Sequence, residues 1–384
     1  MAGHTLRLAV IAVAAVIAGC GDKPQQTGDG ERVLIGQVSP LTGPQAHLGK
    51  DNENGARLAL DEINAAGLTL GGKKVELVME SEDDGADPKT ATTVAQKLVD
   101  EGVVGLIGHL NSGATIPASK IYFDNGIPQI SPSATAVAYT SAGFNTAYRV
   151  MTNDAQQGSV LGNYAVTKLG AKKIAIIDDR TAYGQGLADE VEKAAKAAGG
   201  DVVAREYTSD RSTDFMAILT SIKAKAPDVV FFGGMDPQAA PMIKQMKQLG
   251  MTAKFLGGDG AQTPKFIELA GADAEGALAS NPGLPLDAMP GGSAFKTKFE
   301  AKYGKIQNYA PYAYDAMHVL VEAMKRADSS DPAKYLTELP KTDYQGVTGH
   351  IRFDAKGDLT GGAVTLYQVK DGKWQPLETV QSGK

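Results

Sequence analysis

From residue 33 onward, the chain alternates short runs of apolar, often β-branched residues with longer amphipathic stretches. The short runs have the length and composition of buried strands; they cover residues 33–38, 75–79, 103–107, 129–130, 174–177, 202–207, 229–232 and 255–256. The stretches with helical spacing cover residues 53–65, 89–101, 114–123, 158–169, 187–198, 215–224 and 239–249. This alternation predicts an α/β fold whose parallel sheets are covered by helices on both faces.

The last third of the chain departs from this pattern. A Pro/Gly-rich connection without periodicity is followed by two helical patterns and two short strand patterns; these segments are residues 281–292, 295–303, 312–326, 349–353 and 363–369. They contain few apolar residues for a separate core. A third domain is an alternative, but we expect them to complete the two βα units that precede and follow residue 150.

The N-terminus carries an apolar run at residues 8–18. This run is shorter than the roughly 20 residues that span a bilayer as a helix, and it predicts a secretory signal peptide over residues 1–19. The tetrapeptide Ile-Ala-Gly-Cys that ends at Cys20 is similar to a bacterial lipobox, in which the cysteine becomes the lipidated N-terminus. Cys20 is the only cysteine of the chain. Residues 20–30 are then the lipidated cysteine and a polar, flexible tether.

The length and the charge of the chain limit the classes of function that the sequence supports. The 384 residues, 43% of them hydrophobic and 21% charged, suffice for two domains with their own cores. The net charge of −6 and the absence of a Lys/Arg-dense stretch argue against nucleic acid as a partner.

Polar residues follow several predicted strands, where open parallel sheets bind ligands. Ser112 follows one strand, Ser133 and Thr135 follow the next, and Asp259 lies between glycines after another. Hydroxyls and free amides near helix starts favour an anion such as a carboxylate, and Asp259 could pair with an ammonium group. Ordinary N-caps and a turn aspartate remain alternatives.

Catalytic and metal chemistry have little support. There are only 5 histidines, of which His109 is interpreted as structural and His47 as a loop residue near the expected cleft. The acidic pairs at 83–84 and 178–179 have no third ligand at a useful spacing. We expect no enzyme activity, no metal and no cofactor.

Over nearly its whole mature length the chain resembles the leucine/isoleucine/valine-binding proteins of bacterial ABC importers, a type I periplasmic binding family. The resemblance is carried by residues 38–55, 83–89, 107–119, 130–135, 174–188 and 232–234. It implies two Rossmann-like lobes joined by three crossing strands near residues 148–153, 279–283 and 346–353. The N-terminal lobe would contain residues 31–150 and 283–346, and the C-terminal lobe residues 151–280 and 350–379.

The resemblance also implies a site for a free amino acid. The α-carboxylate would be held at Ser112 and Thr135 with backbone groups of Ser133 and Ala134, and the α-ammonium at Asp259. Residues expected to line the cleft are Tyr183, Tyr309, Leu48 and Met235. Relatives usually carry a longer glutamate at Asp259, aromatic residues at Leu48 and Met235, and in some cases a disulfide at the positions of Ala86 and Asn111.

The expected function is therefore capture of a small amino acid, such as leucine, isoleucine or valine, for the permease of an ABC importer. The protein would be a monomer, anchored to a membrane through lipid on Cys20, at the periplasmic or cell-surface side. A sensor module of the same fold, an extracytoplasmic amide hydrolase, and a binding protein for an amide, urea-like or aromatic acid solute remain alternatives.

Overall fold

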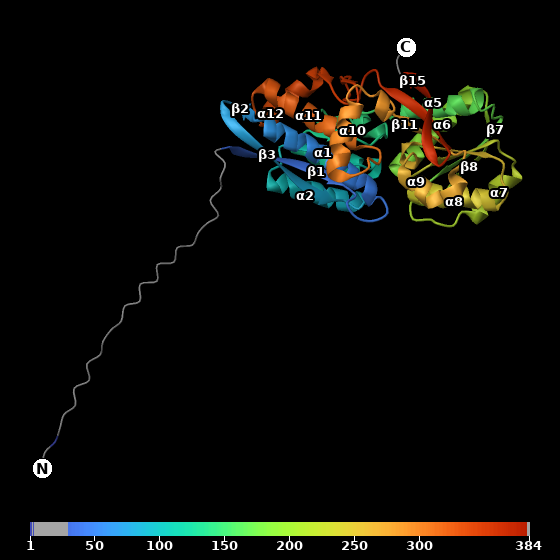
Figure 1. The fold of residues 1–384 in the computed structure, drawn as a ribbon, viewed down its shortest axis with the longest axis horizontal. Helices are drawn as coiled ribbons and strands as arrows, with labels where there is room; N and C mark the ends of the chain where they lie inside the picture. The colour runs from blue at the N-terminus through green and yellow to red at the C-terminus, as the bar shows by residue number, and fades with distance from the viewer. Residues whose placement is uncertain (2, 4–29, 382–384) are drawn as a thin grey trace.

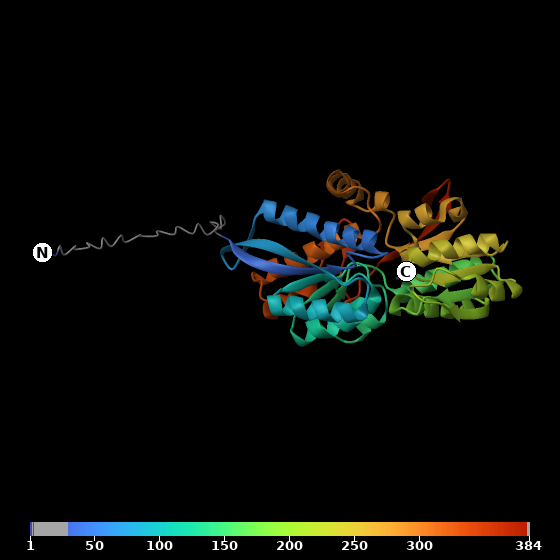
Figure 2. The same cartoon turned by 90° about the horizontal axis from the view of Figure 1, so that it is seen from below.

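The computed structural model describes residues 1, 3 and 30–381, so Cys20 and the predicted cleavage site lie outside the described residues. The chain forms two α/β lobes that lie side by side (Figures 1 and 2). Each lobe is built on its own sheet, with six strands in the N-terminal lobe and seven in the C-terminal lobe. The predicted fold class is confirmed.

The sheet of the N-terminal lobe has the order β2-β3-β1-β4-β5-β6. Its strands are β1 (Glu31–Ser39), β2 (Leu68–Leu70), β3 (Lys73–Asp83), β4 (Gly105–Gly108), β5 (Gln129–Ser131) and β6 (Ala147–Arg149). All neighbours are parallel except β2 and β3. Parallel strands place their carboxyl ends at one edge, which is where loops of the site are expected.

The sheet of the C-terminal lobe has the order β15-β14-β11-β10-β9-β7-β8. Its strands are β7 (Lys173–Asp178), β8 (Asp201–Tyr207), β9 (Val229–Gly233), β10 (Lys254–Gly257), β11 (Leu278–Pro282), β14 (Ala363–Lys370) and β15 (Lys373–Gln381). The strands β8, β7, β9, β10 and β11 run parallel, and β14 and β15 add an antiparallel edge. A separate pair, β12 (Tyr344–Gln345) and β13 (His350–Ile351), precedes β14.

Helices cover both sheets (Figure 2). They are α1 (Ala46–Ala66), α2 (Pro88–Glu101), α3 (Ser112–Asp124), α4 (Ala138–Ser141), α5 (Asp154–Thr167), α6 (Ala182–Ala197), α7 (Met216–Ala224), α8 (Asp236–Gln248), α9 (Pro264–Ala270), α10 (Gly292–Tyr303), α11 (Ala310–Ala327) and α12 (Pro332–Tyr335). Although α10 and α11 come late in the chain, they pack on α1 in the N-terminal lobe. No helix in the part of the chain that the structure describes is long and apolar enough to cross a membrane.

The chain passes between the two sheets after β6, after β11 and before β14. The late segments therefore contribute helices to the first lobe and strands to the second. Among the described residues they form no sheet of their own beyond the short β12–β13 pair, and their small apolar cluster around Phe295 and Phe299 packs on Leu58 of α1. These passages bring the carboxyl-terminal edges of the two parallel sheets to face a common cleft.

Several helices begin earlier than their hydrophobic pattern predicts; three differ by a turn or more, and one of these, α6, begins at Ala182 rather than at residue 187. Helix α1 begins at Ala46 rather than at residue 53, and α5 begins at Asp154 rather than at residue 158. The missed turns contain the buried polar residues Asp51 and Asn52 in α1 and Gln157 in α5. A polar residue that faces inward breaks the apolar periodicity from which helices are predicted.

Candidate ligand-binding site

Loops from the two lobes meet at a small cavity. It is lined by Leu110, Asn111, Ser112, Ser133, Tyr183, Met235, Asp259 and Tyr309. Its volume is about 10 Å³, which is room for about one water molecule. An amino acid can enter only if the lobes or the lining side chains move.

The sheet edges explain why these residues meet. Ser112 begins α3 after β4, and Ser133 follows β5, so both lie at the carboxyl edge of the first sheet. Tyr183, Met235 and Asp259 follow β7, β9 and β10, which are neighbours in the second sheet. The predicted location at the carboxyl ends of the strands is where the cavity lies.

Asp259 is the most densely bonded side chain of the cavity. One carboxylate oxygen accepts hydrogen bonds from Tyr183 Oη (2.9 Å) and Gln157 Nε2 (2.9 Å), and the other accepts from Tyr309 Oη (2.7 Å). Burial raises the pKa of Asp259, and these hydrogen bonds partly oppose that rise. A carboxylate has about four lone-pair sites, so Asp259 can still accept a ligand donor.

Glycines on both sides of Asp259 allow its close packing. A Cβ at Gly258 would lie 2.6 Å from Tyr183 Oη, and one at Gly260 would lie 2.6 Å from Met235 Sδ. The backbone of Gly260 also donates to Tyr183 Oη at 3.0 Å. The backbone at this strand end therefore packs closely, as predicted, against Tyr183 and Met235, which line the cavity.

The two hydroxyl residues that the N-terminal lobe was predicted to contribute, Ser112 and Thr135, are not helix caps. Ser112 is the first residue of α3, whose N-cap is Asn111, and Ser112 Oγ accepts from the Ala136 amide at 3.1 Å. Thr135 is fully buried, and its hydroxyl has no hydrogen-bond partner within the described part of the chain. The N-cap alternative is therefore wrong for both residues, and the Thr135 hydroxyl lies near the buried carboxyl of Asp154.

Asp154 is a second buried acid that the sequence reasoning missed. It is the first residue of α5, it is fully buried, and neither of its carboxylate oxygens has a hydrogen-bond partner in the described structure. Burial, together with the negative charge of Asp259, raises the pKa of Asp154 to about 8, although the nearby Thr135 hydroxyl lowers it somewhat. The positive charge of Arg149 also opposes this rise, but a buried carboxyl without a hydrogen-bond partner is costly.

The lobes also contact each other at the edge of the cleft. His47 Nε2 lies 2.8 Å from Asp236 Oδ2, which joins α1 of the N-terminal lobe to α8 of the C-terminal lobe. Asp236 is buried and also accepts from Thr263 Oγ1 at 2.5 Å. His47 was predicted near the cleft, and it lies on a helix there rather than in a loop.

Of the predicted site residues, Leu48, Ala134 and Thr135 do not line the cavity, whereas Ser133 does. Leu48 is fully buried in the apolar cluster that also contains Met235 and Tyr309. The carbonyl of Ala134 accepts from Arg149 Nη1 at 2.9 Å, and Ser133 Oγ accepts from Asn52 Nδ2 at 3.0 Å. Asn52 was a further residue that the sequence reasoning missed.

Residues considered for catalysis or metal binding have structural partners. His109 is fully buried, with Nδ1 2.8 Å from Asp84 and Nε2 3.1 Å from the Tyr122 hydroxyl. Asp178 pairs with Arg205. In the described parts of the chain no group of three or more His, Cys, Asp or Glu residues could hold a metal ion.

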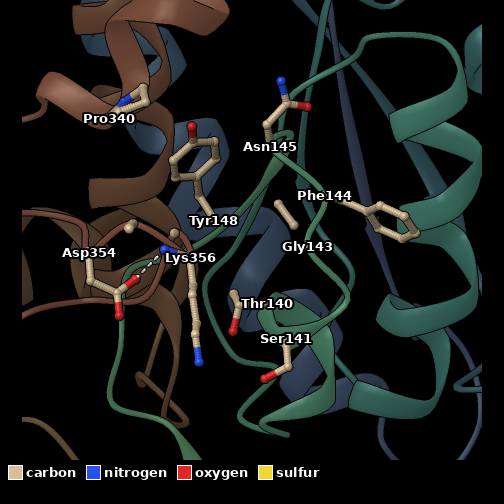
Figure 3. A pocket seen from close by; sticks show the side chains of 12 residues that line it. Thr140, Ser141, Gly143, Phe144, Asn145, Tyr148, Pro340, Asp354 and Lys356 are labelled. Atoms are coloured by element: carbon tan, nitrogen blue, oxygen red, sulfur yellow. Dashed lines mark hydrogen bonds between the residues drawn. The ribbon is translucent and has the colours of Figure 1, made fainter.

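Larger cavities lie elsewhere. One of about 270 Å³ lies against the outer strand β6 and is bordered by the loop around Lys356 (Figure 3). None of the predicted site residues lines it. Its walls come from the N-terminal lobe and the loop before β14, so it is not enclosed by the two facing sheet edges.

Two lobes whose facing loops enclose a buried polar site define the class of two-lobe ligand-binding proteins. The chain belongs to the periplasmic binding protein family, whose model matches residues 32–373.

A Leu/Ile/Val-binding protein homologue of Brucella abortus is 36% identical, over 96% of this chain and 98% of the relative. A leucine-, isoleucine-, valine-, threonine- and alanine-binding protein of Pseudomonas aeruginosa is 34% identical, over 95% of this chain and 96% of the relative. The structure is similar to a branched-chain amino acid transporter substrate binding protein of Streptococcus pneumoniae in complex with isoleucine, with a TM-score of 0.81 and 30% identity over 91% of this chain and all of that one.

Proposed function

We propose that this protein binds a small aliphatic amino acid between its lobes and delivers it to the permease of an ABC importer. The observation that carries the proposal is the pair of buried acids, Asp154 and Asp259, beside hydroxyls that have no charge of their own. Among the described residues neither a lysine nor an arginine lines the cavity, and Asp154 itself is not on its wall. A ligand that brings its own ammonium group would place a positive charge beside these acids and favour loss of the proton that Asp154 otherwise keeps up to about pH 8.

In this proposal the two ends of the ligand have different partners. The α-ammonium pairs with Asp154 and Asp259, and the α-carboxylate accepts from the hydroxyls of Ser112 and Thr135 and from nearby amides. Charge-assisted hydrogen bonds at both ends give the site its affinity. The side chain of the ligand contacts apolar groups, chiefly Met235, whose flexible thioether adapts to differently branched side chains.

The names of the relatives support the identity of the ligand. The two curated relatives are named for leucine, isoleucine and valine, and one of them also for threonine and alanine. All these amino acids share the zwitterionic backbone and have small or medium side chains. We propose leucine, isoleucine and valine as the ligands of this chain.

The proposal includes the cellular setting. The protein acts outside the cytoplasm as a monomeric binding protein without enzyme activity, and lipid on Cys20 holds it at the membrane. Cys20 lies outside the described residues, so this part rests on the lipobox-like sequence. Replacing Cys20 by serine should release the protein from the membrane fraction of its bacterial host without changing its ligand affinity.

Calorimetric titration with leucine and its truncated analogues tests the proposal. The protein is first unfolded and refolded to remove any co-purified ligand. Leucine should bind one-to-one, whereas isocaproate, which lacks the ammonium, and isoamylamine, which lacks the carboxylate, should bind roughly 100-fold more weakly or worse, because each leaves buried groups unpaired. Equal binding of leucine and isocaproate would contradict the ammonium site, and preferred binding of benzoate or urea would move the ligand to another class.

A further inference from the structure

The segment before α11 crosses the cleft to reach Asp259. Tyr309 Oη donates to the Asp259 carboxylate at 2.7 Å, and Asn308 Nδ2 donates to the Asp259 carbonyl at 3.2 Å. These bonds join the N-terminal lobe to the C-terminal lobe inside the site. The position of residues 307–310 therefore decides whether Asp259 has these partners.

A buried carboxylate on α1 fixes that segment. One oxygen of Asp51 accepts from the amide of Gln307 at 2.9 Å. The other accepts from the amides of Asn308 (2.9 Å), Tyr309 (2.7 Å) and Ala310 (2.9 Å). Asp51 thus caps the start of α11 from a different helix, where free amides and the helix dipole favour a negative charge.

Asp51 has no other evident role in the site. It does not line the cavity, and among the described residues the hydrogen bonds of its carboxylate all go to the segment that begins α11. Burying a carboxylate is costly unless it is well bonded. Tyr309 is the N-cap residue of α11 and makes no side-chain cap bond, so its hydroxyl is free to reach Asp259 while Asp51 holds its backbone.

We infer that Asp51 is a positioning residue for ligand capture. It holds residues 307–310 where Tyr309 and Asn308 contact Asp259, and through them it sets ligand affinity and lobe closure without touching the ligand. The inference rests on the proposed function for its affinity readout. Its closure readout does not depend on the identity of the ligand.

The first test compares leucine affinity in the wild type, Asp51→Asn, Tyr309→Phe and the double variant. Each single change should weaken binding about tenfold, the order expected when a hydrogen bond to a charged group is lost. The double variant should be no more than slightly weaker than the worse single variant, because both changes act on one contact. An additive loss, or unchanged affinity in Asp51→Asn, would overturn the inference.

Asp228→Asn is the matched control. Asp228 also accepts from two backbone amides, those of Lys172 (2.8 Å) and Lys173 (2.9 Å), but at the end of β7 that points away from the cleft. The Asp228→Asn change should lower the melting temperature without changing leucine affinity. If Asp51→Asn does not fold, Asp51→Glu keeps the charge but displaces the segment, and it should weaken binding in the same non-additive way.

Small-angle scattering of the protein without added ligand separates this inference from the proposed function. Asp51→Asn should increase the radius of gyration, because the bonds between Asp259 and the segment at 307–310 hold the lobes together, and Asp228→Asn should not. An unchanged radius in Asp51→Asn would overturn the inference. Failure of the wild type to bind leucine would overturn only the proposed function, because the scattering result does not depend on leucine.

Discussion

At the scale of single residues, the two acids of the site differ in how they are satisfied. Asp259 accepts hydrogen bonds from two tyrosines and a glutamine, whereas neither oxygen of Asp154 has a hydrogen-bond partner among the described residues. The sequence predicted Asp259 because it lies between glycines after a strand. It did not predict Asp154, because an aspartate before a helical pattern is an ordinary helix-start residue. Only the folded chain brings Asp154 beside Asp259.

Because of this difference, we predict that Asp154 lowers the stability of the folded chain by an amount that depends on pH. Its pKa is raised to about 8, so between pH 4, near the ordinary pKa of an aspartate, and pH 8 the folded chain keeps a proton that the unfolded chain has lost. In that window stability falls as pH rises, by up to about 1.4 kcal/mol per pH unit for this group.

Asp154→Asn should remove this pH dependence and also the ammonium partner. The melting temperature of the ligand-free variant should exceed that of the wild type by a margin that grows from pH 5 to pH 8, while leucine affinity falls about tenfold or more. Thermal melts over this pH range and calorimetry check both parts. A variant that is less stable than the wild type at pH 8 would contradict the assignment of Asp154 as an unsatisfied acid.

At the scale of elements, the first turns of α1 organise much of the site. His47 contacts the other lobe, Leu48 packs in the core beside the cavity, and Asp51 caps α11. The sequence pattern predicted the strands and most helices, since these have regular apolar spacing. It missed the first turns of α1, α5 and α6; in α1 and α5 the reason is that polar residues there face inward.

We predict that the contact between His47 of α1 and Asp236 of α8 modestly stabilises the closed arrangement of the lobes. His47→Ala removes the bond to Asp236 and should weaken leucine binding several-fold, mainly through faster dissociation, because the bond exists only when the lobes touch. Lys50→Ala is the matched control, since Lys50 lies on the same helix but pairs with Glu53 at the surface. Stopped-flow kinetics would check this, and equal dissociation rates in all three proteins would show that the contact has no part in closure.

At the scale of the whole molecule, the passages between the lobes connect the site to the hinge. Arg149, at the end of β6, is fully buried and bonds the carbonyls of Ala134 and Ala136 at 2.9 Å each. Its Nε also donates to Asp358, in the segment that leads to β14, at 2.9 Å. Arg149 thus connects the loop at residues 134–136 with two of the passages between the lobes. A rotation of the lobes must carry this loop with them.

The two-lobe architecture was predictable from the sequence, through the alternating pattern and the family resemblance. The pairing of distant residues across the cleft was not, because contacts such as Tyr309 with Asp259 depend on how the two sheets face each other. Reversal of a 1:99 equilibrium between open and closed lobes needs about 5.5 kcal/mol of differential binding. Charge-assisted bonds at both ends of an amino acid could supply free energy of this order.

The central claim is that an aliphatic amino acid binds between the lobes in one orientation, and a crystal structure of the protein grown with leucine tests it most directly. We predict leucine in the cleft with its ammonium at Asp154 and Asp259 and its carboxylate at Ser112 and Thr135. Leucine in the reverse orientation, or found only outside the cleft, would contradict the account.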